Sequence, residues 1–168
     1  ILSKTLDCLR SLHASLRRQE QSPLFHKTYH IVVVGEWRGC IHEVNAPIKK
    51  AQGSMVNRVI VSSSGRPAQT IFRTLRITNG YSLVEATPIT GRMHQIRVHA
   101  ASAGFPIAAD RKYGTVSNNQ ELGRLGIKRQ LLHATKIELQ HPETGTLLKI
   151  EAPLPDDFEQ VMSVRRNY

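Results

Sequence analysis

The sequence predicts one domain of the α+β class, with a mixed, mostly antiparallel β-sheet flanked by helices. Residues 27–35 (KTYHIVVVG) are rich in β-branched side chains and predict a strand that is buried at its centre. Asn79-Gly80 separates two further extended segments, as in a tight hairpin between antiparallel strands. The chain has no internal repeat and no low-complexity tract, and its 168 residues are enough to bury the core of one domain.

The N-terminal third is predicted to contain a helix, a strand and a loop region. Residues 1–4 look like the end of a strand. Leu6, Leu9, Leu12 and Leu16 then recur at steps of three and four residues, which predicts an amphipathic helix. Strand 27–35 follows, and the glycines and proline of residues 36–57 predict a pair of loops with one short extended piece.

The rest of the chain is predicted to alternate between strands and helices. Three strands at 58–62, 68–78 and 81–87 are expected to form an antiparallel meander. The elements expected after the meander are a helix at 90–103, a polar loop at 115–128, a strand at 131–139, a strand at 147–151 and a short helix within 155–168.

The composition points to an anionic polymer as partner. The chain has 23 Lys+Arg against 13 Asp+Glu, a net charge of +10, and its pI is about 10.1. The basic residues are spread along the sequence, so we expect a charged face that binds nucleic acid. The alternative is that the excess charge serves solubility alone.

The cysteines and the hydropathy of the sequence indicate in which cellular compartment the protein is expected. Cys8 and Cys40 have neither the spacing of metal ligands nor that of a disulfide framework, so we expect a cytoplasmic protein. No secretion signal opens the chain, and no apolar run approaches the ~20 residues needed to span a bilayer. The first residue is not Met, and we expect the chain to be part of a longer protein.

Residues 90–103 (TGRMHQIRVHAASA) place one arginine where a buried charge needs an anion. On a helix that begins at a Thr90 cap, the predicted apolar arc consists of Met93, Ile96, Ala100 and Ala103. The predicted opposite, polar side consists of Arg92, Gln95, His99 and Ser102. Arg97 falls inside the apolar arc. Because an unpaired buried charge costs several kcal/mol, a carboxylate or phosphate should meet it. The alternatives are a structural ion pair, or an arginine that reaches out to water.

Six motifs in one order give the sequence a specific resemblance. They are KTYHIVVVG at 27–35, GRPAQT at 65–70, TGRMHQIRVH at 90–99, GFPIAADRKYG at 104–114, LLHA at 131–134 and HPETG at 141–145. The chain resembles the catalytic domain of the RluA/RluC group of RNA pseudouridine synthases over nearly all of its length. It looks closest to the RluC branch, which modifies large-subunit ribosomal RNA. The resemblance implies that uridine is isomerised to pseudouridine in ribosomal RNA, without cofactor or metal. We expect a monomer.

The resemblance also implies roles for particular residues. The family uses a tyrosine from its K-x-Y strand and an arginine from its HQIR helix, which here are the catalytic candidates Tyr29 and Arg97. Leu132 matches the apolar wall of the uracil pocket. Near the start of the predicted helix, where phosphates bind well, we expect RNA contacts from Arg92, His94 and Gln95.

The family's nucleophile, an aspartate in a His-Arg-Leu-Asp motif, is not among these 168 residues. By the resemblance it should lie just before Ile1 and pair with Arg97, whereas Asp110 matches a motif position that we expect to be structural. We therefore expect residues 1–168 to be the C-terminal major part of one catalytic domain. Taken alone, this part is expected to be inactive and to lack any N-terminal RNA-binding domain.

Two other function classes stay open at this point. A noncatalytic RNA-binding module would agree equally well with the charge. A metal hydrolase is suggested only by the eight histidines. His94 and His99 would lie about 140° apart on a helix, and no H-E-x-x-H or C-x-x-C accompanies them.

Overall fold

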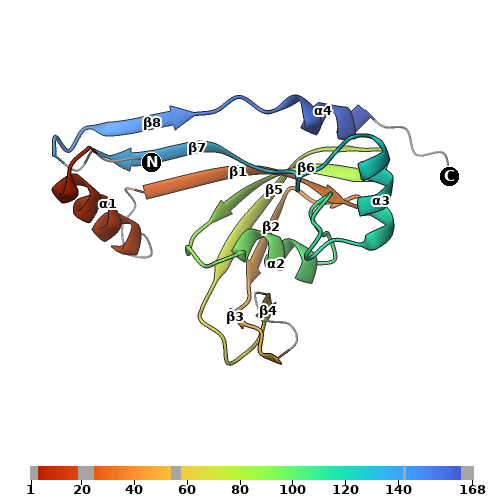
Figure 1. Cartoon of the computed structure of the whole chain (residues 1–168), viewed down its shortest axis with the longest axis horizontal. Coiled ribbons are helices and arrows are strands. Elements are labelled where there is room, and N and C mark those ends of the chain that lie inside the picture. The colour runs from red at the N-terminus through yellow and green to blue at the C-terminus, as the bar shows by residue number, and fades with distance from the viewer. Residues whose placement is uncertain (1–3, 19–24, 54–57, 142, 164–168) are drawn as a thin grey trace.

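A six-stranded antiparallel sheet forms the centre of the computed structural model (Figure 1). The structure describes residues 4–18, 25–53, 58–141 and 143–163. The strands follow the spatial order β2 (Ile41–Asn45), β5 (Gln69–Thr78), β6 (Tyr81–Pro88), β1 (Phe25–Val34), β7 (Leu132–Gln140) and β8 (Leu147–Glu151). All five pairings are antiparallel, which confirms the predicted fold class.

Strand β1 lies near the middle of the sheet because its apolar run is covered on both faces. Ile31, Val32 and Val33 are fully buried, and successive side chains point to opposite faces. Val32 packs into the core shared with α3 (Val116–Arg124) and α4 (Asp156–Ser163). Ile31 and Val33 pack on the other face, where α2 (Gln95–Ser102) lies. Tyr29 has the same parity as Ile31, so it faces α2 as well.

The hairpin between β5 and β6 forms as predicted. Asn79 has φ 51° and Gly80 has φ 75°, the two positive values that a tight hairpin turn of this kind requires. A register shift between Thr74 and Arg76 leaves Leu75 as an extra residue in β5. The turn residues thus fix where the pairing begins, and the bulge adjusts it further along.

The predicted three-stranded meander is wrong at its first strand. β4 (Val59–Val61) pairs with β3 (Ile48–Lys50) in a separate two-stranded sheet, while β5 pairs with β2. Burial explains the difference, because Ile48 and Val59 pack with Val98 of α2 in a small core of their own. Gly65 permits the close approach of the following loop, since a Cβ there would lie 2.6 Å from the carbonyl carbon of Ile48. This hairpin projects from the body of the domain (Figure 1).

The helices at the two ends of the sheet differ in how well they were predicted. α1 (Leu6–Arg18) forms, and Leu12 packs against Phe25 and Leu139, but Leu6 and Leu9 are exposed. α3 replaces the predicted polar loop. Its one fully buried apolar residue, Leu122, gave no periodic signal. α4 lies within the predicted range, whereas the strand predicted at residues 1–4 falls largely outside the described residues.

No helix in the part of the chain that the structure describes is both long and apolar enough to cross a membrane.

Candidate functional site

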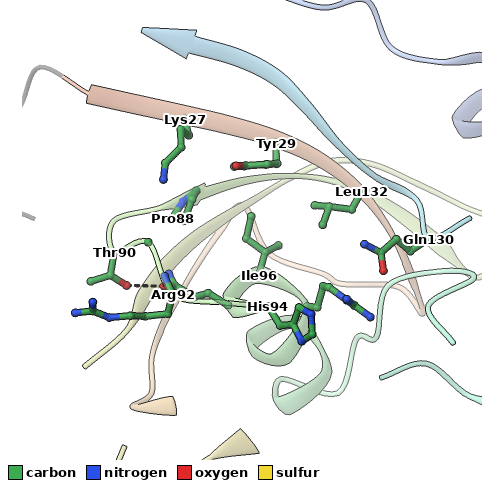
Figure 2. Close-up of a pocket in the computed structure, with 12 residues that line it drawn as sticks. Lys27, Tyr29, Pro88, Thr90, Arg92, His94, Ile96, Gln130 and Leu132 are labelled. Atoms are coloured by element: carbon green, nitrogen blue, oxygen red, sulfur yellow. Dashed lines mark hydrogen bonds between the residues drawn. The ribbon is translucent and has the colours of Figure 1, made fainter. Parts of the chain in front are cut away.

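A cavity of about 300 Å³ lies between β1 and the segment that leads into α2. It is lined by all six predicted site residues, which are Tyr29, Arg92, His94, Gln95, Arg97 and Leu132. Figure 2 shows Lys27 and Tyr29 extending from β1 on one side, with Arg92, His94 and Ile96 on the other. The structure therefore brings the six candidates together, although they span more than 100 positions of the sequence.

The loop before α2 is built by the side chain of Gln95. α2 begins at Gln95 and not at Thr90, so the prediction that Thr90 caps a helix is wrong. The Thr90 hydroxyl donates to Gln95 Oε1 (2.6 Å) and accepts from the Gln69 N–H (3.2 Å). Gln95 Oε1 also accepts the Arg92 N–H (3.0 Å). His94, in the left-handed region at φ 57°, makes the turn into the helix, which is uncommon for a residue other than glycine.

The predicted faces of this helix are partly right, since Ile96 and Ala100 are buried as expected, but two residues of the predicted polar side are buried as well. Gln95 is 3% exposed and His99 is fully buried, whereas Met93, expected in the core, is 47% exposed. Ala103, also expected there, is exposed. The helical wheel was wrong for Gln95 and His99 because neighbouring segments supply polar partners for these two side chains. Gln95 Nε2 donates to the Gln69 carbonyl (2.9 Å) and to the Thr70 hydroxyl (3.0 Å).

His99 is held by two neutral partners. Its Nδ1 lies 2.9 Å from the Thr70 hydroxyl, and its Nε2 lies 2.9 Å from the Ala46 carbonyl. Burial lowers the pKa of His99, and the contact with the Ala46 carbonyl offsets this only in part. The imidazole is therefore neutral near pH 7, and it ties α2 to the turn between β2 and β3.

Arg97 already has its anion within this chain. Its side chain is 13% exposed, so the predicted burial is confirmed. Its Nε donates to Asp110 Oδ2 and its Nη2 to Asp110 Oδ1, each at 2.7 Å, in a bidentate pair. The guanidinium also lies 4.9 Å from the centre of the Tyr113 ring. The burial of Arg97 therefore does not require an acid from outside these residues, and that inference is wrong. The alternative of an ion pair within the chain is what the structure contains.

Asp110 is the most completely satisfied charge of the site. It is fully buried, and Oδ1 also accepts the N–H groups of Lys112 (2.9 Å) and Tyr113 (3.1 Å). Burial raises the pKa of this carboxyl, but the hydrogen bonds from Arg97 and from these two N–H groups outweigh it, so the pKa is lowered. Asp110 is thus ionised near neutral pH. It fixes both the direction of Arg97 and the turn that carries Tyr113.

Tyr113 connects the cavity to the projecting hairpin, and sequence reasoning gave it no role. Its hydroxyl accepts the N–H of Val59 in β4 (2.8 Å) and lies 2.9 Å from His94 Nδ1. Burial, with Arg97 and Lys112 nearby, lowers the pKa of His94. At Nδ1, a neutral His94 can accept a hydrogen bond from the Tyr113 hydroxyl. Its Nε2–H then stays available as a donor.

The side chains on β1 give the cavity both a polar and an apolar side. Tyr29 is half-buried, and this burial raises the pKa of its phenol, so the hydroxyl stays protonated near neutral pH. Lys27, two residues earlier on the same face, has its pKa lowered by burial. Leu132 and Ile96 add apolar surface to the lining. Lys27 was not predicted as a site residue, although the alternation of a strand places it beside Tyr29.

Metal chemistry finds no support in the arrangement of the histidines. His94 contacts Tyr113, whereas His99 contacts Thr70 and Ala46, so the two rings have separate partners. Across residues 4–18, 25–53, 58–141 and 143–163, no group of three or more His, Cys, Asp or Glu side chains could hold a metal ion.

The class of protein to which this fold and its cavity belong is given by a family match. Residues 1–102 match the family described as RNA pseudouridylate synthase, and the chain belongs to this family. The resemblance to the RluA/RluC group is thereby confirmed.

Individual relatives agree with this assignment. The chain is 38% identical over 167 residues to the ribosomal large subunit pseudouridine synthase C of Pasteurella multocida (strain Pm70), covering 99% of this chain and 50% of that protein. It is also 38% identical over 169 residues to the protein of the same name from Yersinia pestis, covering 99% and 52%. The chain thus spans about half the length of these relatives. The solved structure of human RNA pseudouridylate synthase domain containing 1 has the same fold, with a TM-score of 0.73 at 21% identity, over 89% of this chain and 61% of that one.

Proposed function

We propose that the protein containing this chain isomerises uridine to pseudouridine in RNA, with large-subunit ribosomal RNA as its substrate. The observation that carries the proposal is the single cavity lined by Tyr29, Arg97 and Leu132, in a chain of this family. The names of the relatives support ribosomal RNA as the substrate class. The same proposal describes a cytoplasmic monomer that needs neither cofactor nor metal.

The reaction breaks the bond from C1′ to N1 of uracil and forms a bond from C1′ to C5. C5 loses its proton, and N1 gains one. A uracil within folded RNA must first leave its stack and enter the cavity. There the ring of Tyr29 can stack on the base, and Leu132 and Ile96 exclude water. The phenol of Tyr29 is protonated near neutral pH, so it can relay the C5 proton only if it passes its own proton to water in the same step.

The nucleophile is proposed to come from residues upstream of Ile1, as the family resemblance implies. Arg97 can still serve it, because a guanidinium has five N–H donors and Asp110 engages only two of them. The remaining donors are available to a second carboxylate at the cavity wall. In this arrangement Asp110 holds Arg97 in place, and Arg97 orients the upstream aspartate. Residues 1–168 are then the larger, C-terminal part of one catalytic domain.

The three predicted RNA contacts differ in how they are proposed to act, two by direct contact with RNA and one through the shape of a loop. Arg92 and His94 are partly exposed and can reach a phosphate beside the flipped base. Gln95 is buried, with its amide occupied by Gln69, Thr70 and Arg92. Its contribution is therefore the shape of the loop that presents Arg92.

The experiment compares two chains on ribosomal RNA carrying tritium at C5 of uridine. Extending the chain upstream through a His-Arg-Leu-Asp segment should give tritium release and pseudouridine in the digested RNA. Residues 1–168 alone should bind RNA and release no tritium. In the extended chain Tyr29→Phe, which keeps the ring, should slow release by on the order of 100-fold, while Lys149→Ala on β8 should leave it unchanged.

Either of two results contradicts this proposal. Tritium release by residues 1–168 alone would show that no upstream aspartate is needed. RNA binding without release by the extended chain would favour the noncatalytic RNA-binding module.

A further inference from the structure

A second, larger cavity adjoins the candidate site. Its volume is about 590 Å³, and it shares Arg97, Gln130 and Leu132 with the first cavity. The basic residues that line the rest of it are Arg111, Lys112, Lys128 and Arg129, and we refer to these four as the basic basin. They come from the turn after Asp110 and from the segment between α3 and β7, which the fold brings together beside Arg97.

Two side chains of the basic basin, Arg111 and Lys128, carry positive charge that none of the described residues neutralises through an ion pair. Arg129 forms an ion pair with Asp157 (2.9 Å), and Arg97 forms one with Asp110. Arg111 and Lys128 are exposed, and neither has an ion pair or side-chain hydrogen bond with any of the described residues. Among the residues that the structure describes, none that lines this cavity is acidic. Like charges gathered in this way repel one another, so an anion bound there would relieve the repulsion.

A third cavity lies on the other side of the candidate site. It has a volume of about 450 Å³ and shares Arg92 with the first cavity. Lys49, Lys50 and Arg66, from the β3–β4 hairpin and its flanking loop, also line it. The three cavities therefore follow one another, with Arg92 and Arg97 at the two junctions. No acidic side chain from the described part of the chain lines any of the three.

We propose that the basic basin binds the sugar-phosphate backbone of the RNA strand on one side of the target uridine, and that the hairpin cavity receives the other side. This inference rests on the proposed function, since it takes RNA as the ligand. The strand would then cross the cavity that contains Tyr29 with its backbone held at both ends, which favours turning one base inward. Because no aromatic side chain of the described residues lines the basic basin, we expect contacts with phosphates that are independent of sequence, and no stacking of bases.

The test measures binding of a fluorescein-labelled, single-stranded 20-nucleotide RNA by residues 1–168, from 50 to 300 mM NaCl. The basin variant is Arg111→Ala/Lys128→Ala. The control variant, Lys4→Ala/Lys149→Ala, removes the same net charge at the α1 and β8 end of the molecule, away from α3 (Figure 1). Lys136 still pairs with Glu138 when Lys149 is removed. Because all four replaced residues are exposed, both variants should keep the wild-type melting temperature.

In the basin variant, the plot of log K against log salt should be less steep by about 1.4 than in the wild type. This is the loss of two phosphate contacts at about 0.7 each. Its affinity at 100 mM NaCl should fall on the order of ten-fold, and the control variant should keep the wild-type slope. If the wild-type chain binds RNA but the basin variant and the control variant have equal salt slopes, the proposed role of the basic basin is wrong. The proposed function is not affected by that result. Absence of salt-dependent RNA binding by the wild-type chain would overturn both. A second basin variant, Arg111→Gln/Lys128→Gln, should give the same result as the alanines.

Discussion

Replacing Asp110 by asparagine should destabilise the domain strongly, because the change leaves Arg97 without its counter-charge. The carboxylate accepts four hydrogen bonds, two from Arg97 and one each from the N–H groups of Lys112 and Tyr113. An asparagine has one oxygen, and its NH₂ group would face a guanidinium N–H. Removing one partner of a buried pair costs roughly 3–5 kcal/mol. For a domain of this size that is a fall in Tm of roughly 6–20 °C.

The assay is thermal unfolding at pH 7, followed by circular dichroism, together with urea unfolding. The matched control is Asp110→Asn with Arg97→Met, which removes both charges, keeps an oxygen to accept the N–H groups of Lys112 and Tyr113, and should cost less than Asp110→Asn alone, since no charge is left unpaired. A loss below about 1 kcal/mol for Asp110→Asn would refute the reasoning. So would a double variant that is less stable than the single one.

The pH dependence of the same pair gives an independent check on its sign. The pKa of Asp110 is lowered in the folded protein. Its contribution is therefore fully present above the unfolded value of about 4 and is lost as the pH falls through the lower folded pKa. The difference in unfolding free energy between wild type and Asp110→Asn should stay constant from pH 7 to 5 and shrink below about pH 4.

Two further predictions concern other parts of the site. Because burial lowers the pKa of His99, the unfolded chain binds a proton there more readily, and stability should fall as the pH drops below about 6.5. His99→Gln should therefore be less stable than wild type at pH 7.5 by about 1–3 kcal/mol, with a smaller gap at pH 5.5; an equal gap at both pH values would contradict a neutral imidazole. Arg92→Ala should lower the salt slope of RNA binding by about one, whereas Arg92→Lys should keep it, and an unchanged slope for the alanine variant would count against a phosphate contact.

The sheet could be predicted where local chemistry decides the structure. The β-branched run of β1 has one stable arrangement at the centre of a sheet, and Asn79-Gly80 has one favoured turn. α3 could not be predicted in this way, because Leu122 is its one apolar anchor in the core and its first turns are polar. The partner of β4 was missed for a related reason. Pairing with β3 follows from burial against α2, which is a tertiary contact.

The candidate site shows the same division. The family motifs gave six residues that the fold gathers around one cavity, although their roles stay predictions. The helical wheel failed for Gln95 and His99 because it ranks side chains by polarity alone. It contains no information on the hydroxyl and carbonyl groups of other segments that form hydrogen bonds with these two side chains. It was correct that Arg97 is buried and needs an anion. It could not identify Asp110, which lies 13 positions away and meets the guanidinium through the turn after α2.

The irregularity in the pairing of β1 with β7 has a consequence for the cavity that Tyr29 and Leu132 line. Thr28 pairs with Lys136 and Tyr29 with Ala134, so Thr135 is inserted between them, and its hydroxyl bonds to the Thr28 carbonyl (3.1 Å). Deleting Thr135 would restore an even ladder but invert every side chain on one flank of the deletion. Either Leu132 would turn away from the cavity, or Leu139 would leave the core beneath α1. Because Thr135 is an extra residue, β7 can direct Leu132 into the cavity and Leu139 into the core beside α1, which regular alternation along the strand would not allow.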